Sequence, residues 1–304
     1  MKRAMALLTG LAAMLLLGCT MPEPPRRIAL LYGVSKYNIS LNEGVYPNLS
    51  APDDDADAME AGLSSKGWEV IKRINTEASK TRIIDDIADL AGSNAIVLFY
   101  FSGHGVSYND IAYICPYGAI DSNDRLQLDN SISTKEFYSY LKEAGLEHAI
   151  IILDSCYSGA FVEEGPSIDA IPPVFGVNDK GYIKYKLFLD AGPEAFWQYV
   201  SYSESPSYVV LSAAGSEELS YETSSWGHGV FTYAVLKAME DPKADLDKDH
   251  YVDSSELFEY TKNHLNKYWN NIHKNDYVMN SGQYMDYHPH LSGSPREYAL
   301  WKAR

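Results

Sequence analysis

The stretch NAIVLFYFSGHG, Asn94 to Gly105, carries the strongest fold signal in the chain. Residues 95–101 are apolar without interruption, which is typical of a strand buried on both faces of a parallel sheet. The chain then enters Ser-Gly-His-Gly, which places His104 between two glycines. We expect the strand to end there, because glycines allow a tight turn and the close approach of another backbone.

Strands and helices alternate along the rest of the chain. A second buried run, HAIIILDSC, ends on Cys156. This alternation, with strands buried on both faces, predicts an α/β fold: a mostly parallel central sheet with helices on both faces, in three layers. Strands are expected at 26–34, 68–74, 94–101, 148–156 and 208–215, a small hairpin near 111–118, and helices at 53–67, 79–92, 133–146, 229–240 and 254–269.

The two strand ends carry a pair of side chains suited to nucleophilic catalysis. Ligands bind at the carboxyl ends of parallel strands, so His104 and Cys156 are predicted to meet at one edge of the sheet. A histidine that takes the thiol proton leaves a thiolate, which attacks a carbonyl carbon. The backbone N–H groups of Gly105 and Cys156 are the candidate oxyanion donors. This chemistry requires no cofactor.

The segments FYFSGHG and DSCYSG resemble the paired signatures of the caspase-like cysteine peptidases, in the branch of metacaspases and bacterial caspase homologues. The order of histidine then cysteine, about 50 residues apart, is that of caspases. DAxxM at 55–59 and GHGVFTYAVLKAM at 227–239 also resemble segments of the family, and the likeness spans 27–293. The resemblance implies a caspase-like fold, a peptide or protein substrate, His104 as general base and Cys156 as nucleophile. Cys115 is expected to be a core residue.

The resemblance to metacaspases also implies which residues select the substrate. Asp55 and Asp154 would line the pocket for the residue before the scissile bond. Asp154 lies two positions before Cys156 and so faces the same side of its strand. Paired carboxylates favour arginine over lysine through charge-assisted hydrogen bonds. For Asp55 a plain helix N-terminal charge remains an alternative, since acids crowd that turn.

Other functions stay open at this stage. One alternative is a catalytically weak or inactive caspase-fold module that binds partners at the cell envelope. A different hydrolase or transferase could also use the same pair. The segment 160–207 is expected to be an insertion, which either carries self-cleavage points or has no function. The candidate self-cleavage points are Lys180, Lys184 and Lys186.

The N-terminus predicts export and a lipid anchor. Residues 1–18 have a basic start and a short apolar run, as in a signal peptide. LLGC resembles the bacterial lipobox, with Cys19 as the lipidated first residue of the mature chain. Residues 19–26 form a spacer, the domain spans 27–293, and 294–304 is a tail. Thr20, rather than an aspartate, after the cysteine favours the outer membrane facing the periplasm.

The charge pattern excludes one partner class and suggests a cation. The formal net charge is −16, so a nucleic-acid partner is not expected. The segment DLDKDHYVDSSE has the ligand spacing of a calcium-binding EF-hand loop, although His250 stands where glycine is usual. A helix-capping segment is the alternative. The candidate ligands are Asp245, Asp247, Asp249, the Tyr251 carbonyl, Asp253 and Glu256.

Overall fold

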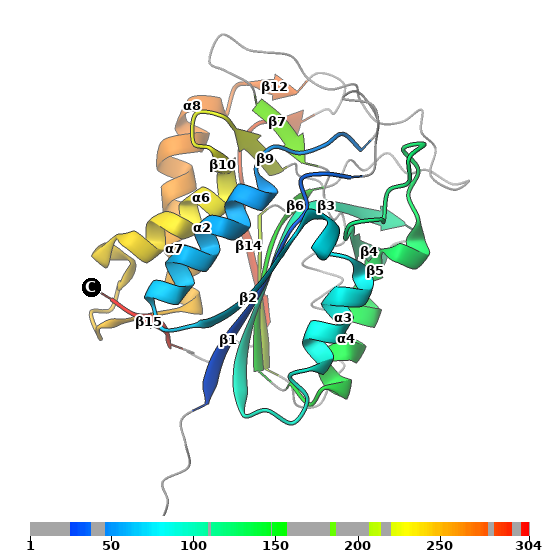
Figure 1. Cartoon of the computed structure of the whole chain (residues 1–304). Coiled ribbons are helices and arrows are strands. Elements are labelled where there is room, and N and C mark those ends of the chain that lie inside the picture. The colour runs from blue at the N-terminus through cyan, green and yellow to red at the C-terminus, as the bar shows by residue number, and fades with distance from the viewer. Residues whose placement is uncertain are drawn as a thin grey trace, which may run out of the picture.

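A mostly parallel sheet forms the centre of the molecule (Figure 1). The computed structural model describes residues 25–37, 46–108, 111–146, 148–156, 183–186, 207–213, 220–278, 283–293 and 299–303. The main path of the sheet runs β14-β8-β6-β3-β1-β2. Along this path β2, β1, β3, β6 and β8 are parallel to one another, and β14 is antiparallel to β8. The bounds are β1 Arg26–Gly33, β2 Glu69–Ile74, β3 Ala95–Tyr108, β6 His148–Cys156, β8 Ser207–Ser212 and β14 His290–Gly293.

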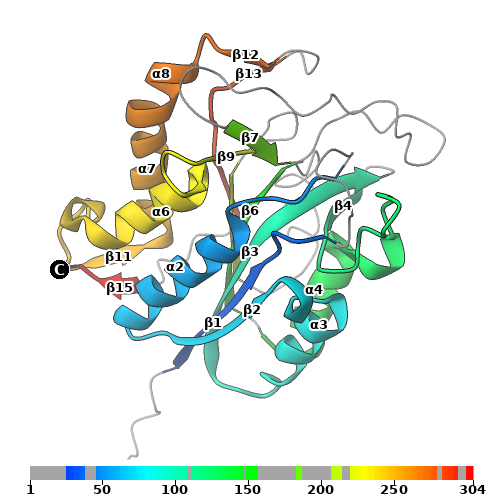
Figure 2. The ribbon, with the colours of Figure 1, turned by 45° about the horizontal axis from the view of Figure 1, so that its top comes forward.

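Helices cover both faces of this sheet, which confirms the predicted three-layer α/β fold. One face carries α2 (Pro52–Ser65), α6 (Val230–Glu240) and α7 (Ser254–Leu265), with α6 between the other two (Figure 2). The opposite face carries α3 (Lys80–Ala88) and α4 (Thr134–Glu143). All five helices were predicted, with ends within a few residues of those observed.

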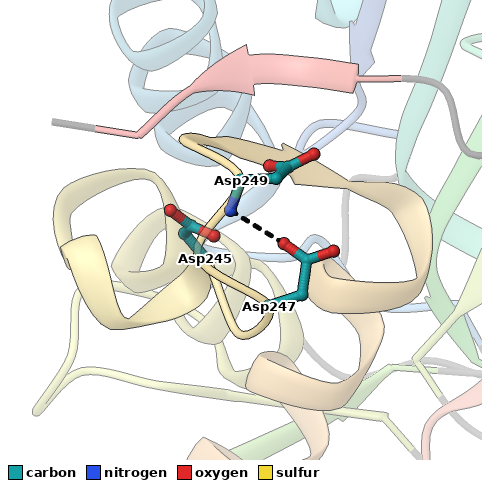
Figure 3. Close-up of side chains that lie close together, drawn as sticks. All are labelled: Asp245, Asp247 and Asp249. Carbon is teal, nitrogen blue, oxygen red and sulfur yellow. Dashed lines mark hydrogen bonds between the residues drawn. The ribbon is translucent and has the colours of Figure 1, made fainter.

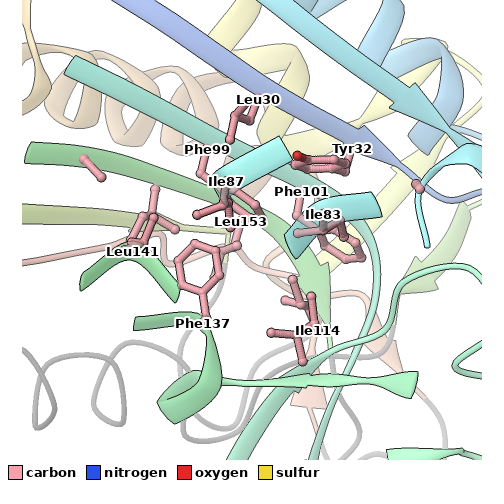
Figure 4. Packing of buried hydrophobic residues seen from close by; sticks show 14 of the residues in the cluster. Leu30, Tyr32, Ile83, Ile87, Phe99, Phe101, Ile114, Phe137, Leu141 and Leu153 are labelled. Atoms are coloured by element: carbon pink, nitrogen blue, oxygen red, sulfur yellow. The ribbon is translucent and has the colours of Figure 1, made fainter. Parts of the chain in front are cut away.

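Two apolar cores follow from the alternation of side chains along the strands. Leu30, Phe99 and Leu153 point toward α3 and α4, where they pack with Ile87 and Phe137 (Figure 4). The alternate strand residues point the other way and pack against α2, α6 and α7. Burial on both faces explains why the strands read as continuous apolar runs.

Local signals account for several helix ends. Ser133 caps α4, and its hydroxyl and the Glu136 carboxylate form a capping box. Helix α2 has Pro52 at its start and three aspartates in its first turn. Their negative charges interact favourably with the positive end of the helix dipole and stabilise the helix. Gly67 follows that helix at φ 84°, a left-handed conformation that glycine adopts without strain.

The smaller elements surround the carboxyl ends of the sheet and the outer helices. Strand β4 pairs with β3 and β5 pairs with β4, while β7, β9 and β10 form a separate sheet. Two further strand pairs are β11 with β15 and β12 with β13. The bounds are β4 Ile111–Ile114, β5 Ile132–Ser133, β7 Ile183–Lys186, β9 Ser220–Thr223, β10 His228–Gly229, β11 Tyr251–Asp253, β12 Tyr277–Val278, β13 Gln283–Tyr284, β15 Ala299–Lys302, the 3-10 turns Asn75–Glu77, Leu128–Asn130 and Pro242–Ala244, the π-helix Asn266–Asn270 and α8 Asn271–His273.

The end of the chain differs from the expected tail. Strand β15, within 294–304, pairs antiparallel with β11. Leu300 and Trp301 are buried, and the Trp68 indole N–H donates to the Leu300 carbonyl at 2.8 Å. The last strand is therefore part of the folded domain, because its apolar residues complete the core behind α2.

Two sequence predictions fall largely outside the described residues. The predicted signal peptide and Cys19 lie there, as does most of the predicted insertion 160–207, including Lys180. Lys184 and Lys186 belong to β7, which pairs with β9.

Candidate active site

The register of β3 and β6 brings the predicted base and nucleophile together. These strands are parallel neighbours, and His104 is the Cα partner of Cys156. Adjacent strands lie about 4.8 Å apart, so the two residues occupy neighbouring positions at the carboxyl edge of the sheet. Strand β6 ends on Cys156.

Strand β3 does not end before the histidine, as the sequence had suggested. It continues through Ser-Gly-His-Gly to Tyr108, pairing with β6 up to His104 and with β4 from Gly105 onward. The expected tight turn is therefore wrong. The pairing of β4 with the far end of β3, from Gly105 with Ile114 to Tyr108 with Ile111, keeps the motif extended.

Gly103 has a different physical role, which is close packing. A Cβ atom added at Gly103 would lie 2.7 Å from the Tyr37 hydroxyl and 3.0 Å from the Phe101 ring. The Tyr37 hydroxyl accepts the His104 backbone N–H at 2.7 Å and donates to the Cys115 carbonyl at 3.0 Å. Glycine at this position thus lets Tyr37 fix the backbone of the histidine. Sequence analysis missed Tyr37, since nothing in its local pattern distinguishes it from a core tyrosine.

One ring nitrogen of His104 has a defined partner. Its Nε2 lies 2.8 Å from the Pro47 carbonyl oxygen. A carbonyl only accepts hydrogen bonds, so Nε2 carries the proton and, in the neutral ring, Nδ1 carries the lone pair. The ring is buried, and the rings of Tyr37 and Tyr46 lie at centroid distances of 4.6 and 5.8 Å. This arrangement makes Nδ1 the proton acceptor of His104.

Asp154 lies on β6 and is fully buried. Its carboxylate accepts from the Ser220 hydroxyl at 2.9 Å, and from the Thr232 hydroxyl and backbone N–H at 2.6 and 3.1 Å. Because Thr232 lies in the first turn of α6, the carboxylate also meets the positive end of the helix dipole. Asp154 therefore ties α6 and β9 to the strand that carries the candidate nucleophile.

Asp55 forms a similar junction from the first turn of α2. It is fully buried and accepts from the Ser102 hydroxyl at 3.0 Å, from the Gly229 N–H at 3.0 Å and from His228 Nδ1 at 3.0 Å. Ser102 and His228 are site residues that the sequence analysis did not single out. Ser102 directly precedes Gly103 in the histidine motif, so its position was the available signal.

Tyr100 lies between the two carboxylates. Its hydroxyl is 2.7 Å from that of Thr232. Burial, then the charges of Asp55 and Asp154, raise the pKa of Tyr100 well above its ordinary value. The carboxylates of Asp55 and Asp154 are thus both close enough to Tyr100 to influence its pKa.

Cys115 is buried, as predicted, and is a free cysteine. Burial raises the pKa of its thiol to about 12, an effect that a hydrogen bond with Ser131 partly opposes. The thiol is therefore uncharged at neutral pH, and Cys115 is unsuited to act as a nucleophile.

The acidic loop after α6 brings three of its predicted ligands together. Carboxylate oxygens of Asp245, Asp247 and Asp249 all lie within 4.8 Å of one another (Figure 3). His250 adopts φ 76°, the left-handed conformation that the glycine of an EF-hand loop would supply. No described α-helix leads directly into the loop, because α6 ends at Glu240 and a 3-10 turn follows.

The end of the same loop caps α7. The Asp253 carboxylate accepts the Glu256 N–H, and the Glu256 carboxylate accepts the Asp253 N–H. The other Glu256 oxygen accepts from the N–H groups of Leu246 and Asp247 at 2.7 and 3.1 Å. The capping alternative is thus observed for these two acids, and a cation that needs Glu256 must replace the loop N–H groups.

The fold and the neighbouring histidine and cysteine positions define a caspase-like α/β protein. A family model described as the caspase domain matches residues 26–282, so the chain belongs to the caspase-domain family, a family of cysteine peptidases. The crystal structure of protein GSU0716 from Geobacter sulfurreducens is similar, with a TM-score of 0.53 at 17% identity, and covers 92% of this chain and 98% of that one. That likeness shows the fold alone. The comparison with curated proteins found no match.

Proposed function

We propose that the protein is a cysteine endopeptidase that uses Cys156 and His104, in the metacaspase branch of its family. The observation that supports this most directly is the pairing of His104 with Cys156 across two parallel strands, with the histidine held by Pro47. His104 Nδ1 takes the thiol proton, and the thiolate attacks the carbonyl carbon of the scissile bond.

The rest of the cycle follows from the same groups. The backbone N–H groups of Gly105 and Cys156 hold the oxyanion of the tetrahedral intermediate. The C–N bond then breaks, His104 gives its proton to the leaving amine, and a thioester to Cys156 remains. Water, deprotonated by His104, hydrolyses the thioester and restores the thiol. No metal or cofactor takes part in these steps.

The proposed pocket selects arginine, and lysine less well. Asp55 and Asp154 supply two buried carboxylates, and Asp154 lies two positions before Cys156 on β6. Because both carboxylates already accept bonds from protein donors, an incoming guanidinium must exchange with some of them. The test is hydrolysis of otherwise identical peptide reporters with arginine, lysine or aspartate before the scissile bond, with and without calcium. We expect arginine first, and cleavage after aspartate alone would overturn this assignment.

We further propose that the protein is exported and anchored by lipid at Cys19, after removal of residues 1–18. Within the described part of the chain, none of the helices combines the length and apolarity needed to span a bilayer. The proposal rests on the sequence: a basic start, a short apolar run and LLGC, followed by a short proline-containing spacer. The proposed location is the outer membrane, facing the periplasm.

Replacing Cys19 tests the anchor. In a host that processes lipoproteins, we expect the parent protein in the membrane fraction with a mature N-terminus at Cys19 whose mass includes acyl chains. Cys19→Ser should remove the acyl mass and release the protein, whereas Cys115→Ala should leave both unchanged. An unmodified Cys19, or a mature chain that starts elsewhere, would contradict the anchor.

We propose that the loop from Asp245 to Glu256 binds calcium weakly. The gathered carboxylates suit a hard cation, while the competing loop N–H groups at Glu256 reduce the affinity. In isothermal titration we expect a dissociation constant of about 0.1–1 mM, the range of weak calcium modules. Asp247→Asn should weaken binding, and Glu259→Gln, on the surface of α7, should not. No heat at millimolar calcium would leave helix capping as the role of the loop.

A further inference from the structure

The carbonyl that holds His104 belongs to a short segment without helix or strand, residues 46–51. The proline ring fixes φ at Pro47, so the direction of its carbonyl depends mainly on ψ. That angle is set by where the neighbouring residues are held. The interactions of residues 46–51 therefore decide how His104 is oriented.

A buried carboxylate holds the downstream end of this segment. Glu222, on β9, is 2% exposed and accepts from the Ser50 N–H at 2.9 Å, the Ser50 hydroxyl at 2.7 Å and the Ala51 N–H at 2.9 Å. These bonds connect residues that are 171 and 172 positions apart in the chain. Hydrogen bonds to a charged acceptor are stronger and shorter than neutral ones, so this junction fixes the backbone just after Pro47.

A second carboxylate holds the upstream end. Asp124 lies in the loop between β4 and β5, and its carboxylate accepts the Tyr46 N–H at 2.9 Å. Asp124 itself has φ 61°, an uncommon left-handed conformation that its turn maintains. Tyr46 is buried, and its ring packs against that of His104.

The middle of the segment is anchored to the chain after β1. The Leu49 N–H donates to the Ser35 carbonyl at 2.9 Å, and the Asn48 side chain accepts the Tyr37 N–H at 2.8 Å. These contacts bring in Tyr37, which already fixes the His104 backbone. Among the contacts of residues 46–51 described above, those with Asp124 and Glu222 involve carboxylates. Asp124 acts before Pro47 in the chain and Glu222 after it.

We propose that Glu222 and Asp124 are positioning residues for His104. Together they hold the Pro47 carbonyl where it selects the Nε2–H tautomer, which leaves the lone pair on Nδ1. This inference deepens the proposed peptidase function and assigns to both residues an effect on catalysis through Pro47, without contact with the substrate.

The first test reads the tautomer of His104 and needs no substrate. In a Cys156→Ala background, no thiolate interacts with the ring, and at about pH 9 imidazole is neutral because its ordinary pKa is about 6.5. Nitrogen-15 shifts of the His104 ring should then show the Nε2–H tautomer alone. Adding Glu222→Gln or Asp124→Asn should produce a mixture of both tautomers, because each amide replaces a carboxylate oxygen with a group that cannot accept the backbone N–H equally well.

The second test uses the active protein and a matched control. Glu222→Gln and Asp124→Asn should lower kcat by about 10- to 100-fold, as expected for a small misplacement of a catalytic group, with little change in KM. Asp86→Asn is the control, since Asp86 is also a buried carboxylate but bonds to Tyr32 and Arg73 on β1 and β2. It should alter neither kcat nor the tautomer.

The outcomes separate this inference from the peptidase proposal. A parent protein without peptidase activity but with tautomer mixing in the variants would refute the peptidase function and retain the positioning role. An unchanged tautomer in a folded variant, or the same mixing in Asp86→Asn, would overturn the positioning role. Should one variant fail to fold, the other decides, because the two act from different elements on opposite sides of Pro47.

Discussion

Cys156→Ala and His104→Ala should each lower kcat/KM for peptide hydrolysis by about four orders of magnitude or more, the effect expected when one member of a cooperating pair is lost. Without the sulfur no acyl-enzyme forms. Without the imidazole the thiol stays largely protonated near neutral pH, because its ordinary pKa is about 8.5. Steady-state kinetics with the preferred peptide reporter measure both effects.

The control for this prediction is the second cysteine of the domain. Cys115 is buried with a thiol pKa of about 12, so Cys115→Ala should retain activity within a few-fold of the parent. Circular dichroism and thermal unfolding should show that all three variants fold. Full activity in folded Cys156→Ala would show that another group is the nucleophile.

Asp154→Asn should abolish the preference for arginine. Replacing the carboxylate removes one of the two charges of the proposed pocket but keeps the side chain's size. Loss of one partner from a buried, hydrogen-bonded charge pair costs about 3 kcal/mol, so kcat/KM for the arginine reporter should fall roughly 100-fold. A reporter with a neutral residue before the scissile bond should lose far less.

The same substitution should also affect stability. Asparagine has one acceptor oxygen, whereas the Asp154 carboxylate accepts from Ser220 and Thr232 through two. A buried donor left without a partner costs about 1–3 kcal/mol, which thermal unfolding can measure. Asp86→Asn is again the control, with lost stability and an unchanged arginine preference. An unchanged preference in folded Asp154→Asn would contradict the pocket assignment.

The central sheet was predictable because its strands are buried on both faces. Continuous apolar runs such as Ile28–Tyr32 and Ala149–Leu153, alternating with helices, are typical of a parallel sheet covered by helices. The continuation of β3 was not predictable, since a glycine such as Gly103 taken alone indicates the end of a strand. The chain stays extended because β6 pairs with β3 up to His104 and β4 pairs with it from Gly105. The short strand β15 likewise depends on a distant partner, because it pairs with β11 about 50 residues earlier in the chain.

The candidate site was partly predictable for the same reason. His104 and Cys156 lie on strands just after continuous apolar runs, which a local pattern can reveal. Pro47 and Tyr37 gain their roles only from contacts with His104 in the folded chain, 57 and 67 residues away in sequence. Glu222 likewise reads as one acid in a polar segment, and only the folded chain brings it to Ser50.

The most direct test of the central claim is the mass of the protein during turnover. Peptide esters with arginine, lysine or aspartate before the scissile bond are mixed with the protein, and the reaction is quenched in acid within its first turnovers. We predict a mass increase equal to the acyl group, as a thioester on Cys156 that disappears in Cys156→Ala. Hydrolysis without any adduct on Cys156, or an adduct on another residue, would contradict the account.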